Sequence, residues 1–425
     1  MTDRPATARD RARLGLVVVL VAMVAGLIGS LTRCLSIGIE TICFGFDYTT
    51  APDGVAAAPV WRRLCVAVLA GLACGFCWRM IRRRPRGMPP GIAEAVDPDP
   101  AGRIRLPVRS SVADALAQLL IVGSGLSLGR ESAPRILAAV GGQMVLDRTR
   151  LGEEERRLLV GSAAGAGLAA VYNTPAAAAF YTVELILRPD LRTRRGWAHT
   201  GLAALVCVIA TVVSWAFNHD EPVYAVPPVT PAAPDSPWLL PVAVAAALLV
   251  GWAFNALIGA ARRHAPPTRL LVGTVPLGAL AVAVLAVWQP LVVGNGQVIV
   301  QHVLAGGLTP AALITLLVAK ACGTATALVT GSTGGLLTPS LAVGACTGGI
   351  VGVVAGADPA TTVMLAVAGA GCVLALNQKA PLFAAFFAIE LTKAPPSLAV
   401  WALLAVWAVW CLDLLITGAL RRRRR

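Results

Sequence analysis

The chain has 425 residues, of which 57% are hydrophobic and 14% are charged, and its mean hydropathy is +0.73. Because soluble domains carry about 25% charged residues, this composition excludes an ordinary cytosolic enzyme and is typical of an all-α polytopic membrane protein. The formal net charge of +14 would suggest nucleic-acid binding in a soluble protein, but the basic residues gather between apolar runs without aromatic interleaving, so we expect no nucleic-acid partner.

Apolar segments follow one another along the whole chain. They lie at about 14–31, 55–78, 111–126, 133–146, 157–172, 175–187, 198–217, 238–261, 270–292, 310–329, 337–356, 361–376, 381–392 and 397–419. The first is long enough to span and lacks a small-residue cleavage site, so we interpret it as a membrane helix and not a signal peptide. Several others are too short to cross a bilayer of about 30 Å. Short segments broken by Gly and Pro indicate discontinuous helices, as in transporters.

The basic residues predict the topology. They cluster at Arg82–Arg84 and Arg86, at Arg188, Arg192, Arg194 and Arg195, at Arg262, Arg263 and Arg269, and at Arg421–Arg425. The segment 218–237 carries three acidic residues and no Lys or Arg, so the positive-inside rule places it outside the cell. We therefore expect a multi-pass protein of the cell membrane with both termini cytoplasmic, and a final arginine run that contacts anionic membrane lipid.

The chain contains an internal repeat. Each copy has a Gly-broken motif ending in proline, then AGAG, a second proline, and a glutamate nine residues after it. The pairs Pro134/Pro339, Pro175/Pro381 and Glu184/Glu390 have offsets of 205, 206 and 206 residues. We therefore predict a cytoplasmic segment 1–13, a first membrane repeat 14–217, an extracellular linker 218–237, a second repeat 238–419 and a basic tail 420–425. Such repeats usually place a substrate site where they meet.

Three glycine-rich breaks are candidate anion sites. They are 123–134, which contains Glu131, 330–339, and 87–94. A helix start exposes unpaired N–H groups and about half a positive charge, which attract an anion. An ionisable residue inside a membrane indicates function by default, although Glu131 could also be a simple helix-capping carboxylate. If the breaks converge, they form a site for a dehydrated monovalent anion that needs no metal or covalent chemistry.

Enzyme signatures are missing from the sequence. The four histidines are scattered without metal-ligand spacing or a nucleophile partner, so we expect no enzyme activity, metal or cofactor. An intramembrane hydrolase is a weak alternative. Ser127 and Ser132 are interpreted as small turn residues. Cys74 and Cys77 form a CxxC within an apolar run, which we interpret as helix packing.

These motifs resemble the CLC chloride channels and chloride/proton antiporters. Gly129-Arg-Glu131 resembles the family's Gly-Arg-Glu-Gly-Pro, 334–345 resembles Gly-Gly-x-Phe-x-Pro and its extension, and both Pro-to-Glu segments have counterparts. Lys320 falls where the family commonly has a basic residue. The resemblance covers about residues 14–419 and implies the CLC fold, a homodimer with one pore per subunit, and two inverted-topology helical repeats in each subunit.

The resemblance also implies the site residues. Glu131 resembles the gating glutamate, whose carboxylate occupies an anion position and leaves it when protonated or when chloride competes. The ligand expected is chloride or another small anion. The implied anion-binding residues, mostly through backbone N–H groups, are Gly129, Arg130, Gly335, Leu336, Leu337, Thr338, Pro90, Gly91 and Ile92.

The departures from the family pattern bear on mechanism. Pro90 stands where the central-site serine is expected, and no tyrosine follows Tyr224. Leu185 stands where the antiporters have an internal proton-accepting glutamate, while Glu184 resembles a neighbouring structural glutamate. Because leucine cannot relay a proton, a channel-like or uncoupled chloride pathway is favoured. The alternative is proton-coupled antiport of chloride or another halide, and a degenerate member without transport is a third possibility.

Overall fold

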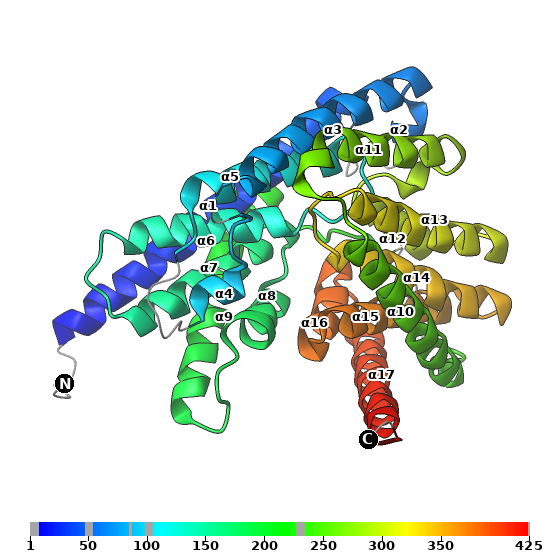
Figure 1. Cartoon of the computed structure of the whole chain (residues 1–425). Helices are drawn as coiled ribbons and strands as arrows, with labels where there is room; N and C mark the ends of the chain where they lie inside the picture. The colour runs from blue at the N-terminus through cyan, green and yellow to red at the C-terminus, as the bar shows by residue number, and fades with distance from the viewer. Residues whose placement is uncertain (1–7, 47–53, 85–86, 98–104, 227–233, 424–425) are drawn as a thin grey trace. The chain divides into compact units, whose positions relative to one another are not determined.

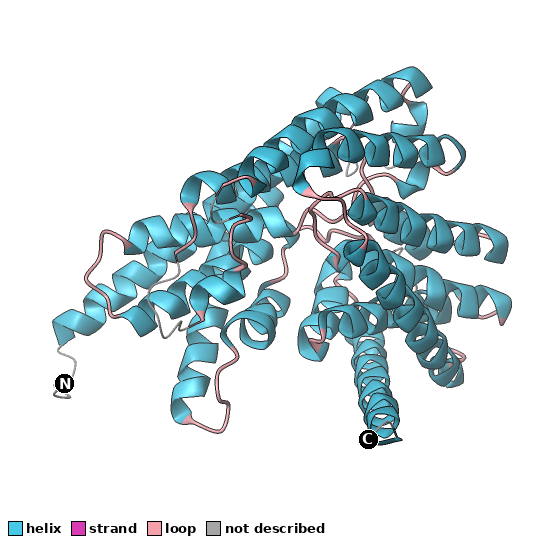
Figure 2. Cartoon of the chain, in the orientation of Figure 1, coloured by secondary structure: helices cyan, strands magenta, loops and turns pink. Residues whose placement is uncertain are grey.

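The computed structural model describes residues 8–46, 54–84, 87–97, 105–226 and 234–423. In these ranges the chain consists of helices and connecting loops, as Figure 2 shows, with one isolated antiparallel bridge between Gly129 and Gly335. The expectation of an all-α protein is confirmed. The predicted assignments of 1–7, 227–233 and 424–425 lie outside the described residues.

Long apolar helices dominate the described part of the chain. Nine of the helices there are long and apolar enough to cross a membrane, at Arg11–Phe44, Val60–Arg82, Arg194–Asn218, Pro237–Arg263, Thr268–Trp288, Pro310–Val329, Leu337–Val354, Pro359–Gln378 and Pro396–Leu420. Shorter apolar helices lie at Pro175–Leu187 and Pro381–Thr392. This combination of full-length and short apolar helices is that of a multi-pass membrane protein.

The chain forms two compact units. Unit 1 comprises the described residues of Met1–Arg33, Met88–Ala115 and Ala133–Glu221. Its α-helices, labelled in Figure 1, are α1 (Ala8–Phe44, up to Arg33), α4 (Ile92–Val96), α5 (Val108–Gly123, up to Ala115), α6 (Ser132–Leu146, from Ala133), α7 (Glu153–Tyr172), α8 (Pro175–Tyr181) and α9 (Arg194–Asn218). The π-helix η1 (Thr182–Leu187) directly follows α8. Within this unit α7 packs against α8 and α9.

Unit 2 comprises the described residues of Cys34–Gly87, Leu116–Ser132 and Pro222–Arg425. Besides the ends of α1 and α5, it contains α2 (Gly54–Ala57), α3 (Val60–Arg82), α10 (Leu240–Arg263), α11 (Leu271–Trp288), α12 (Gln297–Ala305), α13 (Pro310–Val329), α14 (Leu337–Val354), α15 (Pro359–Gln378), α16 (Pro381–Thr392) and α17 (Pro396–Arg423). Short 3-10 turns are η2 (Pro237–Leu239), η3 (Thr268–Leu270) and η4 (Pro290–Val292).

The α14–α15 pair makes the most extensive helix–helix contact in unit 2. Both helices are lined with small residues, and a Cβ added at Gly344 or Gly348 of α14 would collide with the α15 backbone. In return, Gly369 of α15 lies against Gly344 and Gly348. Such small residues let two membrane helices approach to backbone contact, so α14 is held tightly along its length. Its N-terminus therefore has a fixed position within unit 2.

The repeated sequence motifs have the same local structure in both copies. Asn173 follows α7 with φ +54°, and Lys379 follows α15 with φ +58°, so each helix ends in a left-handed residue. Two residues later Pro175 and Pro381 begin α8 and α16, as proline does at a first helical position. The limits of the two predicted repeats remain a prediction.

The structure differs from the predicted segments in two informative places. The first helix runs from Ala8 to Phe44, well beyond the predicted 14–31, because Arg33 and Glu40 interrupt the apolar pattern without breaking the helix. The helix α12 was not predicted at all. Its two glutamines and His302 lower its hydropathy, although five of its apolar side chains are buried.

Candidate functional site

Glu131 is the centre of the candidate site, which lies within unit 2. It directly precedes α6, and its side chain is completely buried. One carboxylate oxygen, Oε1, accepts a hydrogen bond of 2.8 Å from the backbone N–H of Thr338. The same oxygen accepts a hydrogen bond from the Thr338 hydroxyl. The carboxylate is therefore held by a residue of the first turn of α14.

The local sequence explains why α14 starts at this point. The helix begins at Leu337 after a loop that contains Gly331, Gly334 and Gly335. Pro339 is its third residue, and the N–H groups of the first turn have no partner within a helix, so the N–H that proline lacks is not needed there. The remaining N–H groups of the first turn point away from the helix and carry the positive end of its dipole. A buried carboxylate placed there receives charge-assisted hydrogen bonds, which are the stronger kind.

The two glycine-rich loops are joined by a short antiparallel bridge. The Gly129 N–H donates to the Gly335 carbonyl over 2.8 Å, and the Gly335 N–H donates to the Gly129 carbonyl over 2.7 Å. A Cβ added to either glycine would collide with the Glu131 carboxyl group. Glycine is thus required at both positions to make room for that group. In this conformation both N–H groups serve the bridge, and anion binding by Gly129 and Gly335 stays a prediction.

A buried lysine contacts the glycine-rich loop that precedes α6, residues 124–131, which is the first loop. Lys320 of α13 is fully buried, and its Nζ donates to the Ser127 hydroxyl over 2.9 Å and to the Gly294 carbonyl over 2.7 Å. Ser127, interpreted from the sequence as a small turn residue, thus accepts a specific hydrogen bond through its side chain. A buried ammonium group needs such partners because an unpaired one is very unfavourable.

A buried ion pair joins the same loop to α1. The Arg130 guanidinium pairs with the Glu40 carboxylate of α1, and both side chains are buried. A longer contact of 3.4 Å joins Arg130 Nη2 to the Gln297 amide oxygen of α12. Because the Arg130 side chain is directed to Glu40, the prediction that Arg130 binds an anion applies to its backbone N–H.

The remaining predicted ligands fall into two groups. Leu336 and Leu337 lie at the start of α14, next to Thr338, so the structure brings these predicted residues together with Glu131. Pro90, Gly91 and Ile92 lie at the start of α4 in unit 1, where the Glu94 carboxylate accepts a hydrogen bond of 3.1 Å from the Gly91 N–H. Their part in the site remains a prediction.

Sequence reasoning missed three partners of the first loop. Glu40, Gln297 and Gly294 contact Arg130 or Lys320 from segments distant in sequence. Glu40 offered a signal, because a carboxylate within a run of apolar residues indicates a partner. No cluster of three or more His, Cys, Asp or Glu residues suited to a metal ion occurs within the described ranges. In the candidate site, the Glu131 carboxylate is bound by the backbone N–H and the hydroxyl of Thr338.

Comparisons with known proteins show which family the chain is similar to. The family profile described as "Voltage gated chloride channel" matches residues 70–413. The voltage-gated ClC-type chloride channel ClcB of Escherichia coli O157:H7 is 28% identical over 392 residues, which cover 88% of this chain and 90% of that protein.

Solved structures show the same fold. The crystal structure of a slow cyanobacterial Cl−/H+ antiporter has a TM-score of 0.73 at 20% identity, over 96% of this chain and 98% of that chain. That of a CLC-type fluoride/proton antiporter has a TM-score of 0.65 at 16% identity, over 95% and 96%. These matches confirm the resemblance and the predicted CLC fold. Because the profile spans most of its length, the chain belongs to the voltage-gated chloride channel (CLC) family.

Proposed function

We propose that this protein conducts chloride, or another small anion, across the cell membrane through one pore per subunit of a homodimer, with Glu131 as the gate. The family transports chloride, which supports the substrate class. The observation that carries the proposal is the position of the Glu131 carboxylate on the N-terminus of α14. An anion would be attracted to that helix end by the same N–H groups.

The carboxylate and a chloride ion compete for this position. Two like charges 4 Å apart repel by about 4 kcal/mol at an effective dielectric constant of 20, so both do not share the helix end. When Glu131 is protonated, it loses its charge and the charge-assisted part of its hydrogen bonds to Thr338. The carboxyl group then leaves more readily, and the Thr338 N–H and hydroxyl become donors to the anion.

The glycine-rich loop supports a gate that moves while its surroundings stay fixed. Ser127 and Arg130 are anchored through Lys320 and Glu40, whereas the Glu131 carboxyl group lies against two glycines. A side-chain rotation of Glu131 therefore opens the helix end without any movement of the anchored loop. Gating by side-chain rotation needs no large backbone change.

We favour an uncoupled, channel-like pathway over proton-coupled exchange. Leu185, at the position where the family resemblance implies a proton-accepting glutamate, lies in the π-helix η1 beside Glu184. A leucine side chain neither binds nor releases a proton, so a proton leaving Glu131 finds no acceptor there. We also propose that both termini are cytoplasmic, as the arginine clusters indicate.

The test is chloride efflux from liposomes that contain the purified full-length protein, with a pH electrode outside. An uncoupled pathway gives efflux without stoichiometric proton movement, and an imposed proton gradient does not drive chloride uphill. Proton movement coupled to chloride would overturn the uncoupled pathway and establish antiport. Absence of efflux under all conditions would overturn the transport proposal as a whole. In the same assay, the variant Glu131→Gln tests the gate. Its matched control is Glu221→Gln, a change at an exposed glutamate outside the site.

A further inference from the structure

A cavity of about 550 Å³ lies within unit 1, between the start of α1 and the loop that joins α6 to α7. One part of its wall is cationic, formed by Arg11, Arg13 and Arg150, and another part is apolar, formed by Leu14, Leu16 and Val17. The cavity shares no residue with the Glu131 site. Its mixed wall calls for a ligand that is anionic at one end and apolar at the other.

The positive charge of this cavity is available to a ligand. All three arginines are exposed, and within the part of the chain that the structure describes none of them lies in an ion pair. The one acidic lining residue, Glu155, accepts a hydrogen bond of 2.9 Å from the Gly152 N–H at the start of α7. The cavity therefore carries an excess of positive charge.

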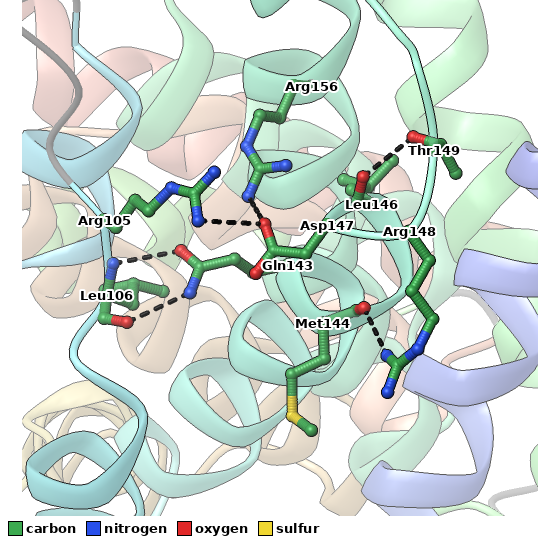
Figure 3. Close-up of polar contacts among 9 residues, drawn as sticks. All are labelled: Arg105, Leu106, Gln143, Met144, Leu146, Asp147, Arg148, Thr149 and Arg156. Atoms are coloured by element: carbon green, nitrogen blue, oxygen red, sulfur yellow. Dashed lines mark hydrogen bonds and ion pairs between the residues drawn. The ribbon is translucent and has the colours of Figure 1, made fainter.

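The residues that precede Arg150 in its loop make the polar contacts drawn in Figure 3. The Thr149 hydroxyl donates to the Leu146 carbonyl over 2.8 Å. Asp147, the acidic residue of this loop, pairs with Arg156 and, at 3.4 Å, with Arg105. Because Arg156 and Arg105 pair with Asp147, its charge is not directed to Arg150.

The cavity also lies at the end of a membrane span. The first candidate span begins at Arg11, so Arg11 and Arg13 mark its polar end and the leucines that follow enter the apolar part. Leu16 is 62% exposed, and Leu20 and Leu27 on the same side of α1 are 42% and 48% exposed. A continuous apolar stripe thus leads from the cavity along the helix.

We propose that this cavity binds the headgroup of an anionic diacyl phospholipid, with the acyl chains along the exposed stripe of α1. Guanidinium groups bind phosphate through paired hydrogen bonds, and basic cavities at the ends of membrane helices suit anionic headgroups. A soluble phosphate would use only the arginines and leave the apolar wall without a partner. The exposed stripe therefore favours a lipid over a free anion.

The experiment is native mass spectrometry of the full-length protein in mild detergent. Dioleoyl-phosphatidylglycerol is titrated in parallel with dioleoyl-phosphatidylcholine, and glycerol 3-phosphate is added as a competitor. We expect the wild type to bind phosphatidylglycerol at least about tenfold more tightly than phosphatidylcholine. The triple variant R11Q/R13Q/R150Q should bind phosphatidylglycerol about tenfold more weakly than the wild type does. The matched control R188Q/R192Q/R194Q removes three exposed arginines of the same unit outside the cavity. It should bind phosphatidylglycerol as tightly as the wild type does.

Three results would overturn the proposal. The first is an equal loss of phosphatidylglycerol affinity in the cavity variant and the control, and the second is equal affinity of the wild type for both lipids. The third is displacement of phosphatidylglycerol by glycerol 3-phosphate at equal concentration. The last would identify a site for soluble phosphate. Elution volume and melting temperature check that each variant is folded. If the triple variant fails these checks, the single exchange Arg150→Gln in the exposed loop provides the same comparison.

Discussion

The Glu131 carboxylate accepts a hydrogen bond from the Thr338 backbone N–H, and the two residues belong to the two glycine-rich segments 123–134 and 330–339. This contact joins the residue before α6 to the first turn of α14. It places a negative side chain where the end of a helix dipole attracts anions. The proposed gate follows from this relationship, because whatever weakens the contact frees the helix end.

The Thr338 hydroxyl offers a direct test of this relationship. Thr338→Val keeps the shape of the side chain and the backbone N–H but removes the hydroxyl donor to Glu131. A hydrogen bond to a charged group contributes about 1.5–3 kcal/mol, so we expect chloride efflux from liposomes at pH 7 to rise roughly tenfold. Thr338→Ser keeps the donor and should behave like the wild type. Equal efflux from the Val and Ser variants would contradict this role of the hydroxyl.

A methyl group at Gly335 should displace the gate. An added Cβ would collide with the Glu131 carboxyl group, so Gly335→Ala is expected to raise efflux at pH 7 several-fold and to reduce its dependence on pH. Gly273→Ala in α11 is the control, since a Cβ there meets nothing within 4 Å. If both variants transport like the wild type, the carboxyl group does not lie against Gly335 in the membrane.

The buried ion pair between Glu40 and Arg130 should stabilise the fold more than it affects transport. Glu40→Gln leaves the buried Arg130 guanidinium without its counter-charge, and such a loss costs about 3 kcal/mol or more. We expect a clear drop in melting temperature in detergent. The double variant Glu40→Gln/Arg130→Gln should recover part of that loss, because no buried charge remains. A single variant as stable as the wild type would show that the pair contributes nothing.

The sequence predicted much of the fold because the signals are local. Apolar length, the repeated prolines and the glycine-rich breaks indicate where helices begin and end, and the structure confirms the all-α fold with Leu337 at the start of α14. The helix α12 escaped prediction because Gln297 and His302 interrupt its apolar pattern, although α12 is largely buried by tertiary packing.

The chemistry of the site was predictable only in part. Glu131 was identifiable as a carboxylate in an apolar context, and Thr338 by its place in a family motif. The contact between Lys320 and Ser127, and that between Arg130 and Glu40, join residues 193 and 90 positions apart in sequence. No local pattern encodes such pairs, since they depend on how α13 and α1 pack against the first loop.

Asp358 gives a prediction for stability as a function of pH, outside the membrane spans. Its carboxylate caps α15 by accepting a hydrogen bond of 2.9 Å from the Thr361 N–H and another from the Thr361 hydroxyl. Burial acts to raise its pKa, but the hydrogen bonds outweigh burial and hold the pKa of Asp358 below its ordinary value. A lowered folded-state pKa stabilises the fold above the unfolded-state pKa of about 3.9, and the contribution is lost as pH falls through the folded-state value.

We therefore expect Asp358→Ala to lower stability at pH 7 by roughly 1 kcal/mol, the usual effect of losing such a cap. The difference from the wild type should shrink below about pH 4, where the Asp358 carboxylate of the unfolded wild type begins to protonate, and should be lost below the folded-state pKa. Asp358→Asn keeps a capping oxygen without a titrating group, so its melting temperature should lack this pH dependence. A constant difference between Asp358→Ala and the wild type from pH 7 to pH 3 would rule out the titration.

The most direct test of the proposed gate is the pH dependence of chloride efflux from liposomes that contain the wild type or Glu131→Gln. The wild-type rate should increase as the pH is lowered, because protonation of Glu131 releases its carboxyl group from the N-terminus of α14. Glu131→Gln should show a high rate that does not change with pH, while the control Glu221→Gln follows the wild type. A Glu131→Gln variant with the wild-type rate and the wild-type pH dependence would contradict the assignment of Glu131 as the gate.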